Sequence, residues 1–222
     1  MGFQAMVLGA TGLVGGFVVK ELLNRAEYDV VKVLVRRPLG IQHPKLIEIL
    51  VDWDHLDQYH ELFDEILDVF CCLGTTIKKA GSQEQFRKVD FEYPIVAAQL
   101  AHAAGVRQFL CVSAMGADPL SRLFYNRTKG EVEEAITAVG IPAVHLFRPS
   151  LLLGNRNEKR LGEGISARFM TTFDFLFQGK AAKYRAIPAE VVARAMVSIA
   201  LTGSTGAHIY PNDVIYAVGL VQ

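Results

Sequence analysis

A glycine-rich turn near the start of the chain constrains the fold more than any other feature. The apolar run at residues 4–10, "QAMVLGA", leads directly into "TGLVGGFVVKELL", which has the periodicity of an amphipathic helix. The pattern G-x-x-G-x-x-G at such a strand-to-helix turn is typical of dinucleotide-binding folds, because a side chain would keep a pyrophosphate away from the backbone N–H groups. The turn predicts a nucleotide-binding segment, with a tight structural turn as the alternative. Its residues are Gly9, Thr11, Gly12, Leu13, Val14 and Gly15.

Short apolar runs alternate with helical segments up to Gly154. The runs are continuously apolar, which is typical of strands that are buried on both faces of a parallel sheet. Helical periodicity occupies the intervening residues 15–25, 92–104 and 129–139. We therefore expect an α/β fold with a doubly wound parallel sheet, whose strands lie at residues 4–10, 30–36, 45–51, 68–74, 107–114 and 143–153.

The length of 222 residues, about half of them apolar, suits one substantial core, so residues 1–222 are expected to form a single domain. The alternation stops after Gly154, and we expect residues 155–222 to contribute a small substrate-side lobe. This tail contains a helical pattern at residues 188–201 and a strand-like pattern at residues 208–219. Its aromatic residues either line a pocket or pack into a core, and these are Phe169, Phe173, Phe175 and Phe177.

Charge and hydropathy argue against two classes of partner. The 23 basic and 23 acidic residues cancel, so no overall field favours nucleic acid or an anionic membrane. No apolar run reaches the roughly 18 residues of a membrane span, and the N-terminal segment lacks a basic leader. These observations predict a cytoplasmic protein.

The cysteines and the one candidate metal motif favour no metal site. Cys71, Cys72 and Cys111 lie inside apolar runs without C-x-x-C spacing, so we expect buried thiols. His60 and Asp64 share a helix face in "VDWDHLDQYHELFDE", but further ligands are not obvious, which favours a solvated polar helix.

Two arginines stand where an NAD-binding chain usually carries an acid. Arg36 and Arg37 stand at the end of the second predicted strand, and a guanidinium can hold a 2′-phosphate by charge-assisted hydrogen bonds. The sequence therefore favours NADP(H), with NAD(H) as the alternative and two ordinary surface arginines as the competing interpretation. Asp52, after the third strand, either reaches an adenine ring or caps the next helix, and both interpretations stay open.

A lysine is placed on the buried side of a predicted helix in "RLFYNRTKGEVEEAI", residues 122–136. Tyr125 and Lys129 are four residues apart and share a stripe with Val132 and Ile136. A soluble domain keeps a lysine out of its core unless the ammonium is paired or used. The same spacing occurs at residues 28–32, but in a strand pattern that separates the two side chains.

Taken together, these motifs resemble the atypical short-chain dehydrogenase/reductase superfamily. The segment "VFCCLGTTIKKAGSQEQFRKVDFEYPIVAAQLAHAAGVRQFLCVSAMGAD" with "FYNRTKGEVE" is similar to its Tat-interactive-protein branch. The resemblance implies a Rossmann fold that binds NADPH, and a loop beside the cofactor formed by Leu73, Gly74, Thr75 and Thr76. It also implies a catalytic set of Ser113, Tyr125 and Lys129, with Lys129 holding the nicotinamide ribose as well. Asp90 stands where many members carry an asparagine, which leaves its role open.

The sequence thus predicts an NADP(H)-dependent oxidoreductase that reduces a carbonyl of a small or medium, largely apolar molecule. Tyr125 would donate the proton, Ser113 would polarise the oxygen, and Lys129 would favour the phenolate and bind the ribose. The main alternative is an NADPH-binding regulatory protein that acts through protein partners, as animal members of the branch are described. An NAD-dependent epimerase or isomerase is disfavoured by the arginines and the short tail. The sequence does not indicate an oligomeric state.

Overall fold

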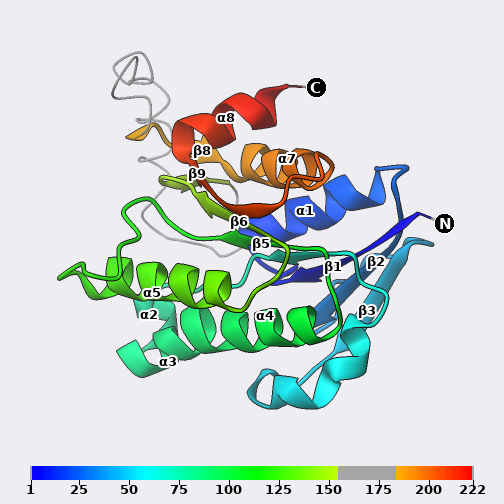
Figure 1. Cartoon of the computed structure of the whole chain (residues 1–222), viewed down its shortest axis with the longest axis horizontal. Helices are drawn as coiled ribbons and strands as arrows, with labels where there is room; N and C mark the ends of the chain where they lie inside the picture. The colour runs from blue at the N-terminus through cyan, green and yellow to red at the C-terminus, as the bar shows by residue number, and fades with distance from the viewer. Residues whose placement is uncertain (1, 155–183, 222) are drawn as a thin grey trace.

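The chain is built around a parallel sheet (Figure 1). The computed structural model describes residues 2–154 and 184–221, and in this part of the chain seven strands pair in the order β3-β2-β1-β4-β5-β6-β9, all parallel. This order confirms the predicted doubly wound sheet, with a reversal between β1 and β4. The strands are β1 Phe3–Leu8, β2 Tyr28–Val35, β3 Leu46–Leu50, β4 Asp68–Cys71, β5 Gln108–Val112, β6 Ala143–Arg148 and β9 Gly206–Pro211.

Helices cover both faces of the sheet. On one face lie α1 Leu13–Leu23, α7 Ala189–Ala200 and α8 Asn212–Leu220, above the sheet in Figure 1. On the other lie α4 Tyr93–Ala103, α5 Phe124–Ala138 and the 3₁₀ helix η1 Trp53–Phe63. The short α2 Ile77–Ala80, α3 Gln83–Arg87 and the π-helical turn η2 Lys88–Glu92 lead from β4 into α4.

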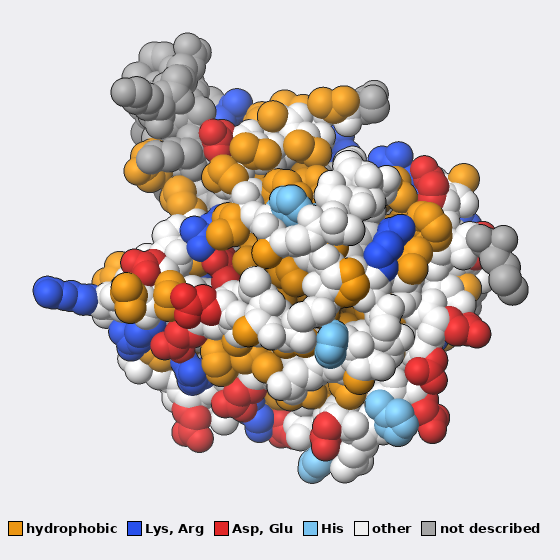
Figure 2. All heavy atoms as spheres, in the orientation of Figure 1, with side chains coloured by type: hydrophobic (Ala, Val, Ile, Leu, Met, Phe, Trp, Pro, Cys, Tyr) orange, Lys and Arg blue, Asp and Glu red, His pale blue; other side chains and the backbone are white. Residues whose placement is uncertain are grey.

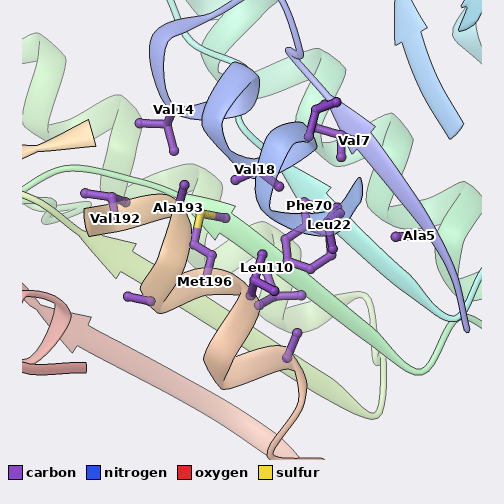
Figure 3. Close-up of a cluster of buried hydrophobic side chains, with 14 of the residues drawn as sticks. Ala5, Val7, Val14, Val18, Leu22, Phe70, Leu110, Val192, Ala193 and Met196 are labelled. Carbon is purple, nitrogen blue, oxygen red and sulfur yellow. The ribbon is translucent and has the colours of Figure 1, made fainter. Parts of the chain in front are cut away.

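Two apolar clusters separate the sheet from its helices because side chains alternate between the faces of each strand. On the α1 side, Val18 and Leu22 pack with Met196 of α7 against Val7 and Leu110 of the sheet (Figure 3). The opposite cluster combines the other faces of the strands with η1, α4 and α5. The central strands are buried on both faces, as their continuous apolar runs predicted, but the edge strand β3 exposes Ile47 and Leu50.

The C-terminal region differs in part from its prediction. The helix expected at residues 188–201 is confirmed as α7, but the strand-like pattern at 208–219 divides into β9 and α8. The helix begins after Pro211, where buried Asn212 accepts a hydrogen bond from the Ser150 N–H and donates one to the Arg185 carbonyl. A β-carbon on Gly219 would lie 2.2 Å from the Val191 carbonyl oxygen, so α8 packs closely on α7.

The described part of the predicted lobe, residues 184–221, supplies α7 and α8 to one helical layer and β9 to the sheet edge. A second, two-stranded sheet pairs β7 Leu152–Leu153 with β8 Ile187–Pro188. The aromatic residues Phe169, Phe173, Phe175 and Phe177 lie outside the described residues. Within the described residues, no helix has the length and apolar character required to cross a bilayer.

Surface charges of both signs are interspersed over α5 and the helices below it in Figure 2. Glu131 on α5 pairs with Arg87 from α3 and lies 3.9 Å from Arg127 on its own helix. Such partly exposed pairs contribute little stability. Because charges of both signs are mixed, this part of the surface has no strong electrostatic potential of one sign.

Candidate functional site

The glycine turn brings the backbones of β1, α1 and β4 very close together. Gly9 has a φ of +83°, and a β-carbon there would lie 2.5 Å from the carbonyl oxygen of Cys72. A β-carbon on Gly15 would lie 2.2 Å from the Gly9 carbonyl oxygen. Gly9 and Gly15 are therefore required by the turn itself.

Gly12 has a different role, because it is the N-cap of α1 and has an ordinary φ of −81°. Its N–H donates a 2.8 Å hydrogen bond to the Gly9 carbonyl, and no side chain caps the helix. Within the described part of the chain, the N-terminal N–H groups of α1 thus face the turn without a side-chain acceptor. Leu13 and Val14 form the first residues of α1, and Val14 is buried in the core.

A cleft with about 530 Å³ of empty space, part of it open to solvent, lies over the turn where the strand order reverses. This is the place where open α/β sheets bind ligands. Six of the residues singled out from the sequence line it, and these are Gly9, Thr11, Gly12, Arg36, Leu73 and Gly74. The other lining residues come from the ends of β2 and β4 and from the helices beyond, namely Leu34, Val35, Trp53, Cys72, Val89 and Tyr93.

An aromatic pair in this lining was missed by the sequence reasoning. Trp53 begins η1 and Tyr93 begins α4, and their ring centroids are 5.7 Å apart. The Tyr93 hydroxyl also donates to the Asp54 carboxylate. The available signal was a tryptophan directly after the third strand, since the carboxyl ends of parallel strands meet at the ligand edge.

Asp52 caps a helix in this structure. Its carboxylate accepts a 3.0 Å hydrogen bond from the Asp54 N–H and contacts the His55 ring at 2.9 Å. The hydrogen bond from His55, and then that from Asp54, holds the pKa of Asp52 below its usual value. Asp52 is absent from the lining of the cleft, as is the exposed Arg37. Of the two interpretations of Asp52, the geometry supports the helix cap.

The buried lysine has a buried partner. Lys129, one turn into α5, is 5% exposed, and its Nζ lies 2.8 Å from Oδ1 of Asp90, which is 1% exposed. Burial lowers the pKa of Lys129, but the negative charge of Asp90 and the interaction with Tyr125 outweigh it, so the pKa is raised above that of an ordinary lysine. The ion pair with Asp90 therefore favours the ammonium form of Lys129, and Tyr125, four residues earlier on the same helix, is 37% exposed.

Gly74 connects this ion pair to the cleft. A β-carbon on Gly74 would lie 3.5 Å from Oδ1 of Asp90 and 4.0 Å from Nζ of Lys129, and Gly74 itself lines the cleft. The Thr75 N–H donates a 2.8 Å hydrogen bond to Oδ2 of Asp90, and the Thr76 hydroxyl caps α2. The loop after β4 thus lies between the ion pair and the cleft.

Ser113 follows β5 at the same edge of the sheet. Its N–H donates a 2.7 Å hydrogen bond to the Phe147 carbonyl, which fixes the backbone. Its hydroxyl is buried and finds no hydrogen-bond partner among the described residues. Buried hydroxyls are nearly always paired, so this one is available for a ligand.

These features fit a dinucleotide. Two turn glycines, an uncapped helix N-terminus and a cleft at the strand reversal suit a pyrophosphate. Ser113, Tyr125 and Lys129 are outside the lining of this cleft, and Lys129 approaches it from behind Gly74. A family described as NAD(P)H-binding matches residues 9–164. The chain belongs to this NAD(P)H-binding family.

Relatives of the chain agree with this family assignment. Protein HTATIP2 of Rattus norvegicus is 35% identical over 220 residues, which cover 97% of this chain and 89% of the rat protein. The mitochondrial protein FMP52 of Debaryomyces hansenii is 31% identical over 203 residues, covering 89% of this chain and 87% of that protein. Together with the family match, they confirm the resemblance inferred from the sequence.

Solved structures with the same fold include other NAD(P)-binding proteins. MoeE5 in complex with UDP-glucose and NAD has a TM-score of 0.72 at 18% identity, covering 97% of this chain and 80% of that one. The oxidoreductase ylbE of Lactococcus lactis has a TM-score of 0.70 at 16% identity, covering 98% and 95%. At these identities the likeness establishes the fold, which is that of NAD(P)-binding oxidoreductases and epimerases.

The expectation of a cytoplasmic protein is wrong, because relatives of this chain in several yeasts are named mitochondrial. The expectation relied on the lack of a basic leader and of a spanning segment. Those signals concern secretion and membrane crossing, so their lack does not distinguish the cytosol from a mitochondrion.

Proposed function

We propose that the protein is an NADP(H)-dependent oxidoreductase that reduces a carbonyl group in a small or medium, largely apolar molecule. The observation that carries the proposal is the position of the Lys129 ammonium, buried directly behind Gly74 of the cleft and next to a partly exposed Tyr125. A tyrosine and a lysine in this arrangement form a proton-donating pair, because an ammonium stabilises the phenolate that remains after proton transfer.

Each of the three polar side chains has a distinct role in this proposal. The reduced nicotinamide, when bound, supplies a hydride for the carbonyl carbon. Tyr125 gives its hydroxyl proton to the carbonyl oxygen. The unpaired hydroxyl of Ser113 donates a hydrogen bond to the same oxygen. Lys129 holds the ribose hydroxyls and stabilises the phenolate.

The preference for NADP(H) is supported by the lining of the cleft. Arg36 lies in that lining directly after β2, and none of the described residues that line the cleft is acidic. An arginine at this place can bind a 2′-phosphate through two parallel hydrogen bonds, whereas NAD-binding chains need a carboxylate for the free ribose hydroxyl.

The test is NADPH oxidation over a panel of aldehydes, ketones and quinones, with the unmodified protein and Tyr125→Phe. We expect turnover of at least one apolar carbonyl compound. The variant should retain NADPH affinity and lose turnover by roughly 10²- to 10⁴-fold, the usual cost of losing a general acid. Turnover that survives in Tyr125→Phe would exclude the tyrosine as the acid. A panel without any turnover would favour the NADPH-binding regulatory function instead.

A further inference from the structure

Asp90 occupies an unusual position in the backbone. It lies in the middle of η2, a π-helical turn of five residues between α3 and α4. Such turns are rare and occur mostly at functional sites, because the extra residue redirects side chains relative to an α-helix. Here the turn buries a carboxylate that is 1% exposed.

The two oxygens of Asp90 bind two different segments of the site. Oδ1 lies 2.8 Å from the Lys129 ammonium on α5, and Oδ2 accepts a 2.8 Å hydrogen bond from the Thr75 N–H in the loop after β4. Gly74, between these contacts, lines the cleft. One carboxylate therefore links the lysine to the cofactor-side loop.

The charge of Lys129 depends on this carboxylate. A buried lysine without a partner loses its proton, because its ammonium is poorly solvated. The largest other contributions to the pKa of Lys129 come from Tyr125 of the same helix and Cys111 of β5. Glu133, one turn farther along α5, is also buried but is paired with Arg148. A hydrogen bond with Cys71 and burial raise the pKa of Cys111 well above its usual value, so this thiol is neutral and cannot replace Asp90.

We propose that Asp90 is a positioning residue, whose negative charge keeps Lys129 protonated and holds it against the Gly74–Thr75 backbone for the dinucleotide ribose. The proposal rests on the proposed function for the identity of the ligand. Its mechanism concerns Lys129 itself and can be measured without cofactor or substrate.

The variant Asp90→Asn separates charge from shape. Asparagine retains an oxygen for the Thr75 N–H but removes the charge that balances Lys129. We expect the ¹³Cε signal of Lys129, followed by NMR without ligand, to titrate above the ordinary lysine pKa of about 10.4 in the unmodified protein. In Asp90→Asn it should titrate well below that value, because burial then outweighs the remaining interaction with Tyr125. An unchanged titration would overturn the proposal.

Cofactor binding gives a second readout. NADPH affinity of the unmodified protein should hardly change between about pH 7 and pH 9, where the 2′-phosphate is fully ionised, whereas Asp90→Asn should lose roughly tenfold or more as the pH rises and Lys129 becomes neutral. A purely structural role for Asp90 would weaken binding equally at each pH, and that result would contradict the proposal.

Asp68→Asn is the matched control. Asp68 is also fully buried and lies 2.9 Å from Arg107, but at the amino end of β4, away from the cleft. This variant should lose stability and leave both the Lys129 titration and the pH dependence of NADPH binding unchanged. If it reproduced the effects of Asp90→Asn, a specific role for Asp90 would be excluded.

A double variant covers the case in which Asp90→Asn alone does not fold. Asp90→Asn with Lys129→Met removes both charges and leaves no buried ion unpaired. Because Asp90 acts through Lys129, the double variant should bind NADPH as weakly as Lys129→Met alone. A further loss of affinity in the double variant would overturn the proposal. Failure of carbonyl turnover would count against the proposed function only, since none of these measurements uses a substrate.

Discussion

The carbonyl oxygen of Gly9 lies 2.2 Å from the place that a β-carbon on Gly15 would take. This approach holds the first turn of α1 against the end of β1, and no larger residue can replace Gly15 without moving the helix. The turn therefore contains glycines of two kinds. Gly9 and Gly15 maintain the backbone geometry, while Gly12 leaves the helix N-terminus accessible.

Gly12→Val is expected to abolish nucleotide binding and to leave the protein folded. The φ of −81° at Gly12 is accessible to valine, and its β-carbon would lie 3.1 Å from the Gly9 carbonyl oxygen, a tight but adjustable contact. The two methyl groups would occupy the approach of the pyrophosphate. Calorimetric titration with NADPH measures the loss, and circular dichroism checks the fold. Normal binding by this variant would mean that the turn is only structural.

Arg36→Ala is expected to reduce the preference for NADPH over NADH by roughly tenfold or more, because a charge-assisted hydrogen bond contributes about 1.5–3 kcal/mol. Arg37→Ala should change the preference less, since Arg37 is outside the lining of the cleft. Trp53, the one tryptophan of the chain, lines the cleft, so its fluorescence reports binding of both cofactors. Equal affinities of the unmodified protein for NADPH and NADH would contradict this prediction.

The residues that the sequence singled out and that line the cleft all lie at or just after a strand end. The glycine turn, Arg36 and Gly74 each come just after an apolar run, and parallel strands bring such ends to one edge. Trp53 was missed although it also follows a strand end, whereas its contact with Tyr93 joins η1 to α4, two elements far apart in the chain. A contact of this kind has no periodicity that could indicate it.

The sequence indicated the buried position of Lys129 but not the residue that pairs with it. The helical stripe indicated a buried ammonium that needs a partner, but its partner Asp90 depends on the π-helical turn η2, for which the sequence has no recognised signal. The C-terminal helix α8 was missed for another reason. Its apolar residues form a nearly continuous run that selects neither period 2 nor period 3.6, and the close packing of Gly219 on α7 is a contact between separate elements that the sequence does not indicate.

His145 should make the protein less stable in mild acid. The residue is fully buried in β6, its Nδ1 lies 3.0 Å from the Tyr210 hydroxyl, and its Nε2 has no partner among the described residues. Burial, and then the charge of neighbouring His208, lowers the pKa of His145 to about 4. The unfolded chain, with a histidine pKa near 6.5, binds this proton first as the pH falls.

The free energy of unfolding should therefore decrease between about pH 6.5 and pH 4, by roughly 3 kcal/mol at most from this residue, since one pKa unit corresponds to about 1.4 kcal/mol. The measurement is urea unfolding at several pH values for the unmodified protein and for His145→Gln, which should show a shallower dependence on pH. The exposed His60 provides the control His60→Gln, which should behave as the unmodified protein. Equal slopes for all three proteins would contradict the assignment.

Ser113→Ala should separate stability from activity. The Ser113 hydroxyl is buried without a partner among the described residues, so the fold loses nothing that stabilises it when the oxygen is removed. A buried, unsatisfied polar group is unfavourable, and we expect the variant to be as stable as the unmodified protein or more stable by about 1 kcal/mol. Ser150→Ala is the matched control, because the Ser150 hydroxyl donates to the Arg185 carbonyl and its loss should destabilise the fold.

Carbonyl reduction by Ser113→Ala should fall by roughly 10-fold or more at unchanged NADPH affinity, since the missing hydrogen bond is made to the substrate oxygen. Thermal unfolding and NADPH oxidation, measured on the same preparations, test both expectations. A clear loss of stability in Ser113→Ala would show that the hydroxyl makes a stabilising hydrogen bond within the protein and is not available to a substrate.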